Sequence, residues 1–574
     1  MRYLALCTDY DGTLAHHGKV DDPTIAALEK FRASGRKLVL VTGRELPDLQ
    51  RVFERLDLFD RVVAENGALI YRPASREERL LADPPPADFI EALRRRGVHP
   101  SLGRCIVATW RPNEGAVLET IRDLGLELQV VFNKGAVMIL PGGVNKATGL
   151  QVALDELNVS IHNTVAVGDA ENDHALLSAC ECSAAVDNAL PAVKQKVDIV
   201  LPLNHGAGVV QLIEEVLTDD LANRTTVLQR HAILLGKDEQ GSAVTLSPFG
   251  VSALVVGTSG GGKSTVASGL IERLRSKDYS FCIIDPEGDY DAVDGTAVLG
   301  NPERAPSIDE CMQLLSKPNE NAVFNLLGIK LSDRPAFFMS LLARIRELRA
   351  KTGRPHWLIV DEAHHVLPVD WKPAELVLPK SFEGMLLISV TPSVIARSAL
   401  ELIETLIVIG ERPREMVLEF ADANSLSAPD VPLDKIPRGQ ALLWHKASGQ
   451  PEVLSIEPTK SERRRHLRKY SEGSLGEDRS FYFRGPEGKL NLRAQNLMVF
   501  LDLADGVDEE TWLHHWKHGD VTQWLRTCIK DEELTAKIAA LEHHVPDDPA
   551  VSRKRVRDVI EESYTLPAEG GGSQ

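Results

Sequence analysis

The chain lacks the features that would place it in a membrane, secreted or disulfide-stabilised class. Its seven cysteines include no Cys-x-x-Cys pair and no even framework, so we expect reduced thiols and a cytoplasmic protein. No apolar run approaches the ~18 residues that a membrane-spanning helix needs. The N-terminus enters a strand almost at once, which does not fit a signal peptide, and we expect no membrane partner.

A basic surface is also missing. The formal net charge of −18 argues against a globally basic nucleic-acid-binding protein, although it leaves room for a local basic channel. No repeat at a solenoid period is found. What is present is an ordinary soluble composition, 43% hydrophobic and 26% charged, over 574 residues. That length is too great for one core and predicts three or four domains.

The stretch LALCTDYDGTL, residues 4–14, joins an apolar run to two carboxylates. Asp9 ends the run and Asp11 follows two residues later, with Gly12 allowing a sharp turn. An apolar run ending in acids is typical of a buried parallel strand whose carboxyl end holds a site. One carboxylate could attack while the other handles a proton. Taken alone, an ordinary Asp-rich turn explains the stretch about as well.

The pattern that follows is that of a doubly wound parallel sheet. Residues 22–34 have helical spacing, and we expect strands at residues 37–41, 62–64, 137–140, 164–167 and 199–201. Polar residues follow most of these strands. The rhythm breaks between about 80 and 140, after Pro84–Pro86, which we interpret as an inserted cap.

Four segments, DYDGT, VTGR, NKATG and VGDAEND, together resemble the four motifs of the haloacid dehalogenase superfamily of phosphatases. The position of the cap after the second motif, and the phrase VVAENGALIY, resemble the Cof and sucrose-phosphatase-like branch. The resemblance covers about 220 residues. It implies a Rossmann-like core with an inserted α/β cap, and activity on a small phosphomonoester.

The resemblance also implies roles for residues in these motifs. Asp9 would be the nucleophile that becomes an aspartyl phosphate, and Asp11 the acid and then the base. Mg²⁺ would be held by Asp9, Asp169 and the backbone carbonyl of Asp11, a set of hard oxygen ligands. The phosphoryl oxygens would be held by Thr42, Gly43, Lys146 and Asn172, and Asp173 with Asn172 would support the metal shell. The plainer interpretation makes Asp169 and Asp173 acids at a helix N-terminus and Lys146 a solvated lysine.

The cap should select the substrate, and it is the least readable part. Arg94, Arg95, Arg96 and Arg104 could meet an anionic substrate, but we favour a solvated helix face.

A second site begins after the strand expected at residues 254–256. GTSGGGKST fits G-x-x-x-x-G-K-[ST] at every fixed position. Such a loop wraps phosphates with backbone N–H groups before the positive end of a helix. Lys263 would reach the β- and γ-phosphates of ATP, and Ser264 would bind Mg²⁺. The predicted nucleotide-binding residues are Gly257, Thr258, Ser259, Gly260, Gly261, Gly262, Lys263, Ser264 and Thr265.

The stretch HWLIVDEAHH supplies the acids that such a loop requires. Asp361 would hold Mg²⁺ and Glu362 would orient the attacking water. Together with DPEGDY at residues 285–290, these features resemble the HerA and FtsK class of motor ATPases over residues 228–456. The resemblance implies a RecA-like domain and a homo-oligomer, as in hexameric rings that share an arginine; Arg397 and Arg412 are candidates. Pro392 stands where the family carries Gln, which puts the coupling role of that position in doubt.

The tail begins with a basic run, SERRRHLRK at residues 461–469, which we interpret as a solvated linker rather than a nucleic-acid contact. A mostly helical module follows, with Trp512, Leu513 and Trp516 on one apolar face. His514 and His518 have i, i+4 spacing, but no HExxH glutamate accompanies them, so we favour surface or core histidines over a metal site.

The sequence thus predicts a multidomain α/β protein. We expect a phosphatase at 1–220 (core 1–79 and 141–220, cap about 80–140), a P-loop ATPase at 221–456, a basic linker at 457–479 and a helical module at 480–574. The favoured function is a Mg²⁺-dependent phosphatase fused to an ATP-hydrolysing domain. The alternatives are a DNA-processing protein that removes end phosphates, and an ATP-gated oligomeric scaffold.

Overall fold

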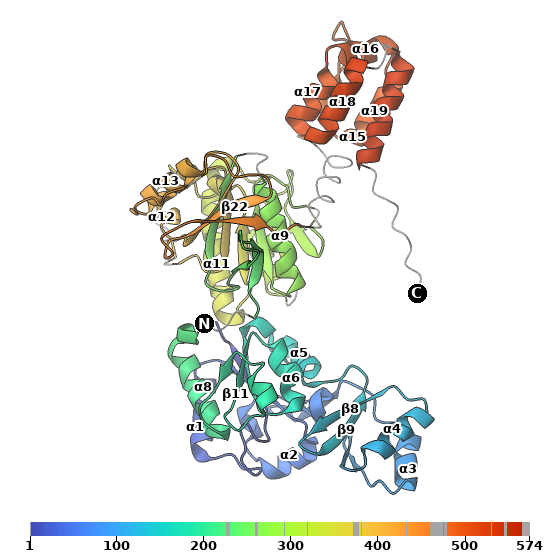
Figure 1. Ribbon diagram of the computed structural model, residues 1–574, viewed down its shortest axis with the longest axis vertical. Helices are drawn as coiled ribbons and strands as arrows, with labels where there is room; N and C mark the ends of the chain where they lie inside the picture. Colours follow the sequence, from blue (N-terminus) through green and yellow to red (C-terminus); the bar gives the residue numbers. More distant parts are fainter. Residues whose placement is uncertain are drawn as a thin grey trace.

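The computed structural model describes residues 2–224, 230–258, 262–291, 293–317, 320–370, 378–379, 381–431, 433–459, 475, 479–529, 531–544 and 548–564. Three bodies follow one another along the long axis (Figure 1). The expected basic run at 461–469 and the residues after 564 lie outside the described part. No helix in the described ranges is long and apolar enough to cross a membrane.

The first body is built on an eight-stranded sheet of order β12-β11-β10-β1-β2-β3-β4-β5. The strands from β12 to β3 are parallel, and β4 and β5 add an antiparallel edge. Its strands are β1 (Ala5–Thr8), β2 (Lys37–Val41), β3 (Arg61–Ala64), β4 (Leu69–Arg72), β5 (Glu77–Leu80), β10 (Thr164–Gly168), β11 (Cys182–Ala185) and β12 (Ile199–Val200). The helices are α1 (Asp22–Ala33), α2 (Leu46–Val52), α5 (Lys146–Leu157), α6 (His174–Ala179), α7 (Pro191–Lys194) and α8 (His205–Asp219).

The sequence accounts for this sheet directly. β1, β2 and β10 are apolar and buried along almost their whole length, as strands covered by helices on both faces must be. The helix α1 begins where the Asp21 side chain accepts a hydrogen bond from the Thr24 backbone, with Pro23 in its first turn. The strands expected at 37–41, 62–64, 164–167 and 199–201 are all confirmed within about one residue.

One strand was assigned to the wrong sheet. Residues 137–140, expected to resume the core sheet, lie in β9 (Ala136–Pro141) of a separate four-stranded antiparallel sheet, order β6-β7-β9-β8. This sheet, with β6 (Ser101–Leu102), β7 (Val107–Trp110), β8 (Leu128–Asn133), α3 (Ala87–Arg95) and α4 (Glu114–Asp123), forms the cap. An apolar run specifies a strand but not its neighbours, and β9 is apolar because α3 and α4 pack on it.

The second body contains an eleven-stranded sheet, order β14-β13-β23-β22-β21-β15-β20-β19-β16-β18-β17. The strands from β21 to β17 are parallel, and the other four are antiparallel. They are β13 (Ile233–Lys237), β14 (Ala243–Leu246), β15 (Ser252–Gly257), β16 (Phe281–Asp285), β17 (Thr296–Leu299), β18 (Asn321–Asn325), β19 (Trp357–Val360), β20 (Met385–Ser389), β21 (Thr405–Ile409), β22 (Gln440–His445) and β23 (Glu452–Ile456). The helices are α9 (Lys263–Ser276), α10 (Ile308–Leu315), α11 (Arg334–Thr352), α12 (Arg397–Leu400) and α13 (Pro413–Ala423).

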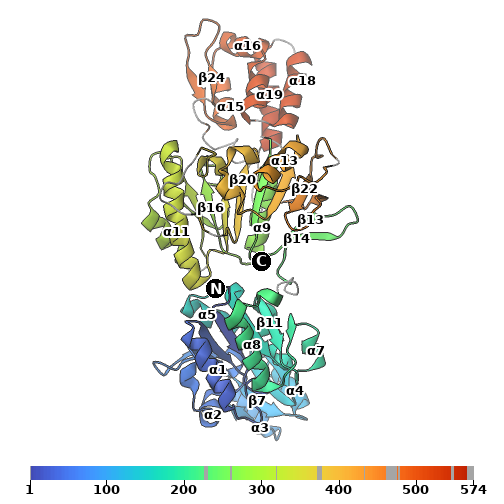
Figure 2. The same cartoon turned by 90° about the vertical axis from the view of Figure 1, so that its left-hand side faces the viewer.

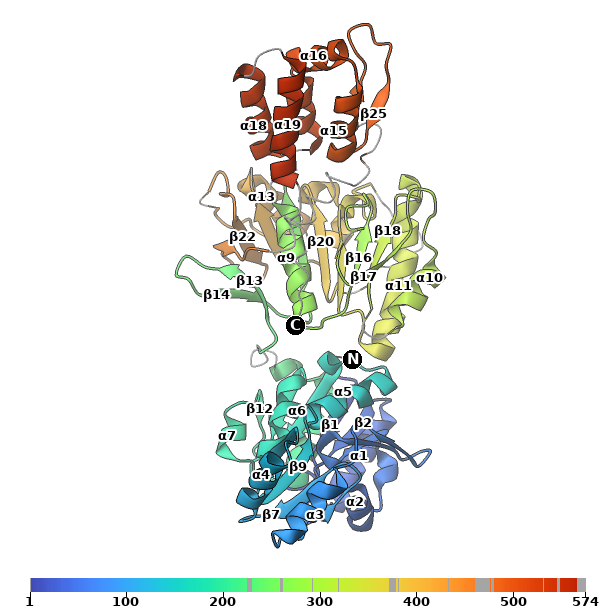
Figure 3. The same ribbon diagram turned by 90° about the vertical axis from the view of Figure 1, so that its right-hand side faces the viewer.

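The third body is a small module with its own core, in which Trp512 and Trp516 are buried as expected. Its helices α15 (Leu497–Gly506), α16 (Glu509–Lys517), α17 (Asp520–Trp524), α18 (Glu532–His544) and α19 (Pro549–Tyr564) pack beside a hairpin of β24 (Phe481–Phe483) and β25 (Leu492–Ala494). Figures 2 and 3 show this module beyond the second sheet, on the side opposite the first body.

The first two bodies meet through buried polar contacts. His162 donates to the Lys277 carbonyl oxygen over 2.7 Å, and the Tyr279 hydroxyl donates to Glu181 Oε2 over 2.6 Å. Close packing adds to this, because a Cβ on Gly353 would lie 2.1 Å from Asn163 Oδ1. The contacts involve the end of α9 and the short helix η3 (Ile161–Asn163) that leads into β10.

Candidate functional site

The residues expected to carry chemistry follow three neighbouring strands. β1 pairs with β2 on one side and with β10 on the other, all in parallel. Asp9 follows β1, Thr42 follows β2 and Asp169 follows β10. Because the carboxyl ends of adjacent parallel strands share one edge, residues far apart in sequence are brought to one place.

A buried lysine connects two of the acids. Lys146 Nζ lies 2.5 Å from Asp9 Oδ1 and 2.6 Å from Asp173 Oδ1. Its side chain is fully buried, as is that of Asp173. The helix α5 delivers this ammonium at its first residue, because the Asn145 side chain caps the helix just before it. A fully buried cation of this kind is stable only with such partners.

The loop after β10 is shaped around Asp173. Asp173 Oδ2 accepts hydrogen bonds from the backbone N–H groups of Asp169 and Ala170, each at 2.9 Å. Asp9, Asp169 and Asp173 each place a carboxylate oxygen within 4.8 Å of the others. Gly12 closes the space above them: its φ is +87°, and a Cβ there would lie 2.3 Å from Asp169 Oδ2.

The electrostatics of this cluster favour a further cation. Burial and the neighbouring charge of Asp173 raise the pKa of Asp9 to about 8, although Lys146 opposes the rise. Asp9 and Asp173 in turn hold the pKa of Lys146 above its ordinary value, so the ammonium stays charged. Burial also raises the pKa of Asp169. Three crowded carboxylates are the oxygen-rich set that hard divalent cations prefer.

Asp11 is held by a partner that the sequence did not indicate. Arg44 Nε and Nη2 each donate to a different oxygen of the Asp11 carboxylate over 2.6 Å. Arg44 also pairs with Asp48 on α2. A bidentate arginine–carboxylate pair is strong and directional, and it fixes the orientation of the Asp11 carboxylate.

The other predicted phosphate-binding residues gather nearby. Thr42 is buried, and its Oγ1 accepts a hydrogen bond from the Arg44 backbone. Asn172 donates to Asn66 Oδ1 over 3.3 Å, and a Cβ on Gly43 would lie 3.4 Å from Asn172 Nδ2. The segments VTGR, ENG and GDAEND therefore meet at one edge, as their motifs predict.

The cap also reaches the site. Lys134, in the turn between β8 and β9, forms an ion pair with Asp169 Oδ2. Its side chain is 47% exposed, whereas Asp169 is fully buried, so this cation lies between the site and solvent. Arg94 and Arg95 are exposed on α3, and Arg104 pairs with Glu78, which is consistent with a solvated face.

The second predicted site lies at the carboxyl end of β15. Lys263 is the first residue of α9, and its Nζ donates to the Gly257 carbonyl oxygen over 2.8 Å. Gly262 precedes it with a φ of +107°, which only glycine adopts readily. Gly257, Thr258, Gly262, Ser264 and Thr265 are in the described chain, whereas Ser259, Gly260 and Gly261 lie outside the described residues.

The predicted acids lie two strands away. Asp361 and Glu362 follow β19, which is separated from β15 by β20. Burial raises the pKa of Glu362, and its neighbour Lys263 opposes that rise, which brings the acid and the P-loop lysine into one electrostatic environment. Asp285, at the end of β16, accepts three backbone hydrogen bonds, yet burial raises its pKa to about 7.

The proposed arginines are on the surface of this chain. Arg397 pairs with Glu401 and Arg412 with Glu415, and both side chains are more than half exposed. In the helical module, His515 Nε2 accepts a hydrogen bond from the Arg484 backbone, and His518 Nδ1 contacts the His514 carbonyl oxygen. The side chains of His515 and His518 therefore take part in local hydrogen bonds, whereas His514 contributes its backbone carbonyl; the side chains of His514, His515 and Asp520 each offer a ligand atom within 4.8 Å of the others.

Comparison with known proteins separates the two sites. A model of the haloacid dehalogenase-like hydrolase family matches residues 6–96 and 117–213. A phosphoglycolate phosphatase of Haloarcula marismortui is 31% identical over 218 residues, which cover 36% of this chain and 95% of that protein. A phosphoglycolate phosphatase of Halorubrum lacusprofundi is 30% identical over 225 residues, which cover 37% of this chain and 97% of that protein.

The chain belongs to the haloacid dehalogenase-like hydrolase family. It is therefore an enzyme, a hydrolase. Among solved structures, a haloacid dehalogenase-like hydrolase from Bacteroides thetaiotaomicron matches with 19% identity and a TM-score of 0.33, covering 37% of this chain and 99% of that one. A second family model, described as the central domain of helicase HerA, matches residues 243–344. The recognised families, and the multidomain α/β fold class, are confirmed.

Two residues of this candidate site were not found from the sequence. Arg44 was visible at the end of VTGR, but nothing in its spacing showed that it would bind Asp11. Lys134 lies in a cap segment without a motif, and only the antiparallel turn between β8 and β9 brings it to Asp169. A basic residue in a tight turn of a cap is the only available signal.

We predict that the stability of the metal-free protein falls as pH rises. Because the pKa of Asp9 is raised to about 8 in the folded chain, the native state holds a proton that the unfolded chain loses near about pH 4. Stability should therefore decrease between about pH 4 and about pH 8 and level off above that, and Mg²⁺ should reverse much of the loss. Thermal unfolding in EDTA and in Mg²⁺ measures both effects.

The matched control for this pH effect is Asp9→Asn, which cannot ionise and should flatten the pH dependence. A wild-type melting temperature in EDTA that does not change across this pH range would contradict the prediction.

Proposed function

We propose that the N-terminal region is a Mg²⁺-dependent phosphomonoester phosphatase and that the middle region binds and hydrolyses ATP. The observation that carries the first part is the buried ion chain from Asp9 through Lys146 to Asp173. It places a carboxylate, a cation and further acids at the carboxyl edge of a parallel sheet. We also propose the division of the chain at about residues 220, 456 and 479.

The reaction begins with Asp9. One carboxylate oxygen attacks the phosphorus of the substrate, and the bond from phosphorus to the ester oxygen breaks. Asp11 gives a proton to the departing oxygen, so the alcohol leaves neutral. Lys146, 2.5 Å from Asp9, balances the charge that accumulates on the phosphoryl oxygens, with Thr42, Gly43 and Asn172 as further contacts.

Hydrolysis of the aspartyl phosphate completes the cycle. Asp11, now ionised, takes a proton from water, and the resulting hydroxide attacks the phosphorus. The bond between phosphorus and Asp9 breaks, inorganic phosphate leaves and Asp9 returns as a carboxylate. In this scheme Asp11 must exchange its proton, so its bidentate pair with Arg44 has to open during turnover.

The residues present fit a magnesium ion. Asp9, Asp169 and Asp173 offer carboxylate oxygens within 4.8 Å of one another, and Mg²⁺ takes oxygen ligands. Asp9 and Asp169 would hold it with the Asp11 carbonyl, and Asp173 would support them. When bound, the cation keeps Asp9 ionised and reduces the repulsion between this anion and a phosphate.

The substrate class we propose is a small phosphomonoester with a second negative charge. Two lines support it. The relatives are named phosphoglycolate phosphatases, and phosphoglycolate carries a carboxylate beside its phosphate. Lys134 reaches the site from the cap, where the part of a substrate that is not transferred would lie.

For the middle region, the support is the conjunction of a P-loop with two strand-end acids. Lys263 and Ser264 would bind the phosphates and Mg²⁺, Asp361 would hold the metal and Glu362 would orient water. Glu362 Oε2 is buried without a hydrogen bond in the described structure, which leaves it able to accept one from water.

The two activities should separate genetically. We expect Asp9→Asn to lower phosphatase turnover by about 10³-fold or more, because it removes the nucleophile. ATP hydrolysis should persist in that variant. Lys263→Ala should show the converse, because its side chain lies in the other body. Steady-state release of phosphate from p-nitrophenyl phosphate and from ATP, with both variants folded by circular dichroism, measures this.

If either variant lost both activities, the proposal that the two sites act independently would be contradicted. Failure of acid quenching to trap phosphate on Asp9 would contradict the nucleophile itself.

Lys134 should act on the choice of substrate rather than on the chemistry. We expect Lys134→Met to raise KM for phosphoglycolate about 10-fold or more, a loss of charge-assisted hydrogen bonding. Turnover of p-nitrophenyl phosphate, which has no carboxylate, should change little. Arg95→Met, an exposed cap cation elsewhere, is the matched control. Equal effects of Lys134→Met on both substrates would contradict the assignment.

The HerA match favours a second candidate function, in which the ATPase acts on nucleic acid and the phosphatase removes end phosphates. On this hypothesis, DNA should stimulate ATP turnover several-fold, and the stimulation should fall steeply with salt as counterions are released. ATPase assays at about 50 and about 200 mM salt, with and without DNA, test it. ATP turnover that ignores DNA at every salt concentration would exclude this candidate.

A further inference from the structure

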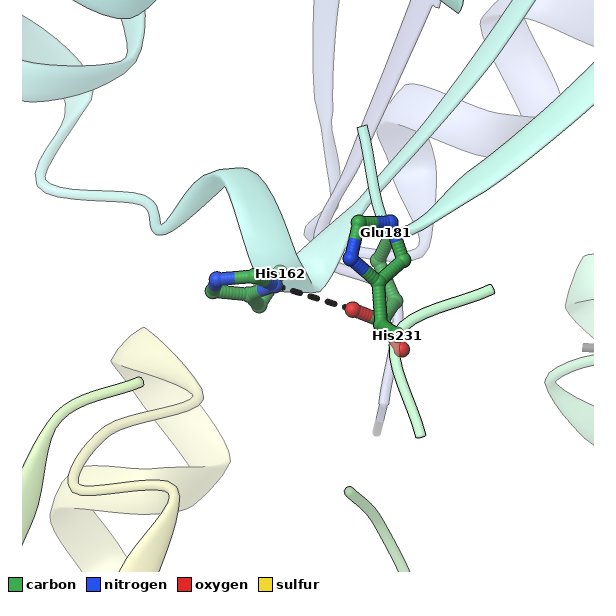
Figure 4. A group of neighbouring side chains, drawn as sticks. All are labelled: His162, Glu181 and His231. Carbon is green, nitrogen blue, oxygen red and sulfur yellow. Dashed lines mark hydrogen bonds and ion pairs between the residues drawn. The ribbon is translucent and has the colours of Figure 1, made fainter. Parts of the chain in front are cut away.

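A cluster of two histidines and a glutamate lies where the first two bodies meet. His162 belongs to η3, Glu181 precedes β11, and His231 precedes β13 in the second sheet. Each offers a ligand atom within 4.8 Å of the others. Figure 4 shows the His162 ring directed at the Glu181 carboxylate, with the His231 ring beside it. None of these residues takes part in the sites described above.

The hydrogen bonds of His162 leave one nitrogen unexplained. Its Nε2 is 2.7 Å from the Lys277 carbonyl oxygen, which can only accept, so Nε2 carries a hydrogen. In the neutral ring, Nδ1 then presents a lone pair to Glu181 Oε2, 2.9 Å away. A lone pair facing a carboxylate oxygen is repulsive unless a proton or a metal cation lies between them. His162 and Glu181 are 3% and 2% exposed, so water does not screen the contact.

The tautomer of the His231 ring is fixed in the same way, by a backbone carbonyl. Its Nε2 lies 3.2 Å from the Cys180 carbonyl oxygen and must donate to it. Nδ1 of His231 is therefore the lone pair left for a ligand, and burial lowers its pKa, which favours the neutral ring that a metal requires. Backbone carbonyls that fix the tautomer of each ring are the usual outer partners of histidine ligands.

Space and access are available beside the cluster. A cavity of about 310 Å³ is lined by both histidines together with Gln151, Lys277 and Asp278. Bond lengths of about 2.0–2.2 Å place tetrahedral ligand atoms roughly 3.4 Å apart. His162 Nδ1 and Glu181 Oε2 are 2.9 Å apart, and all three ligand atoms lie within 4.8 Å of one another, limits that include this value. The cavity leaves a fourth position for water.

Three positive side chains lie near the cluster, and each is paired with an acceptor outside the proposed ligand atoms. Arg2 lies 3.4 Å from Glu181 Oε1, the oxygen that the cluster does not use. Arg230 pairs with Asp198, and Lys277 Nζ donates to the Ala232 carbonyl oxygen, so both positive groups have acceptors of their own. The Tyr279 hydroxyl donates to Glu181 Oε2 and orients the carboxylate.

We propose that His162, Glu181 and His231 bind a Zn²⁺-type transition metal that ties the hydrolase body to the entry strand of the ATPase body. Two imidazoles and one carboxylate suit zinc, whereas Mg²⁺ selects oxygen ligands. His231 leads into β13, and His162 is anchored on the residue after α9, so the metal would fasten both connections at once.

The test uses the full chain in excess Mg²⁺, which occupies the oxygen-rich sites. Titration with Zn²⁺ by calorimetry, and with Co²⁺ by its visible absorption, should find one site that His231→Ala weakens by at least about 10-fold, the size of effect that even outer partners have. Glu181→Gln should weaken it similarly. Replacing His99, an exposed cap histidine, by alanine (His99→Ala) should leave the affinity of this site unchanged. His514→Ala should show whether any of the bound Zn²⁺ is held by the helical module.

Because His231 is only partly buried, its alanine variant should keep the fold, which circular dichroism checks. Wild type and His231→Ala binding Zn²⁺ with the same stoichiometry and affinity would overturn the proposal. In that case a proton, rather than a metal, lies between His162 and Glu181.

Discussion

The hydrolase body depends on a single buried cation. Lys146 has no exposure to water, so its charge is tolerable only because Asp9 and Asp173 lie within 2.6 Å of it. Each of the three groups comes from a different segment, after β1, at the start of α5 and after β10. Lys146 therefore has both of its ion-pair partners only when the sheet, the helix and the strand-end loop are in their native positions. The same requirement that stabilises the fold places Asp9, the proposed nucleophile, beside Lys146, the proposed phosphate-binding group.

The cap completes this arrangement from outside. Its antiparallel sheet is separate from the core sheet, yet the turn between β8 and β9 reaches Asp169 through Lys134. The core thus provides the clustered acids and Lys146, and the cap provides an adjacent positive charge. A family that shares its core can change substrates by changing such turns.

The sequence predicted the parts of this protein that depend on local pattern. Strands β2, β10 and β15 were found because apolar runs ended in polar motifs. Lys146 and Asp169 were singled out because the segments NKATG and VGDAEND resemble motifs of the haloacid dehalogenase superfamily. The sequence could not assign β9 to its sheet, since an apolar strand does not specify which neighbours it pairs with. Arg44 and Lys134 were missed for a related reason: their partners lie 33 and 35 residues away and are chosen by the tertiary fold. The cluster at His162 was invisible because its members come from three unrelated segments.

The helix α9 connects the P-loop of the second body to the contact with the first body. It starts at the P-loop lysine and ends one residue before Lys277, whose carbonyl accepts from His162. Its 14 residues make a stiff rod of about 21 Å. Two residues after His162, β10 begins and runs to Asp169. An axial displacement of the rod would therefore strain the hydrogen bond between His162 and Lys277, or be passed to the strand that precedes Asp169. His162 is thus one of the contacts, together with the pair of Tyr279 and Glu181, through which the two bodies are coupled.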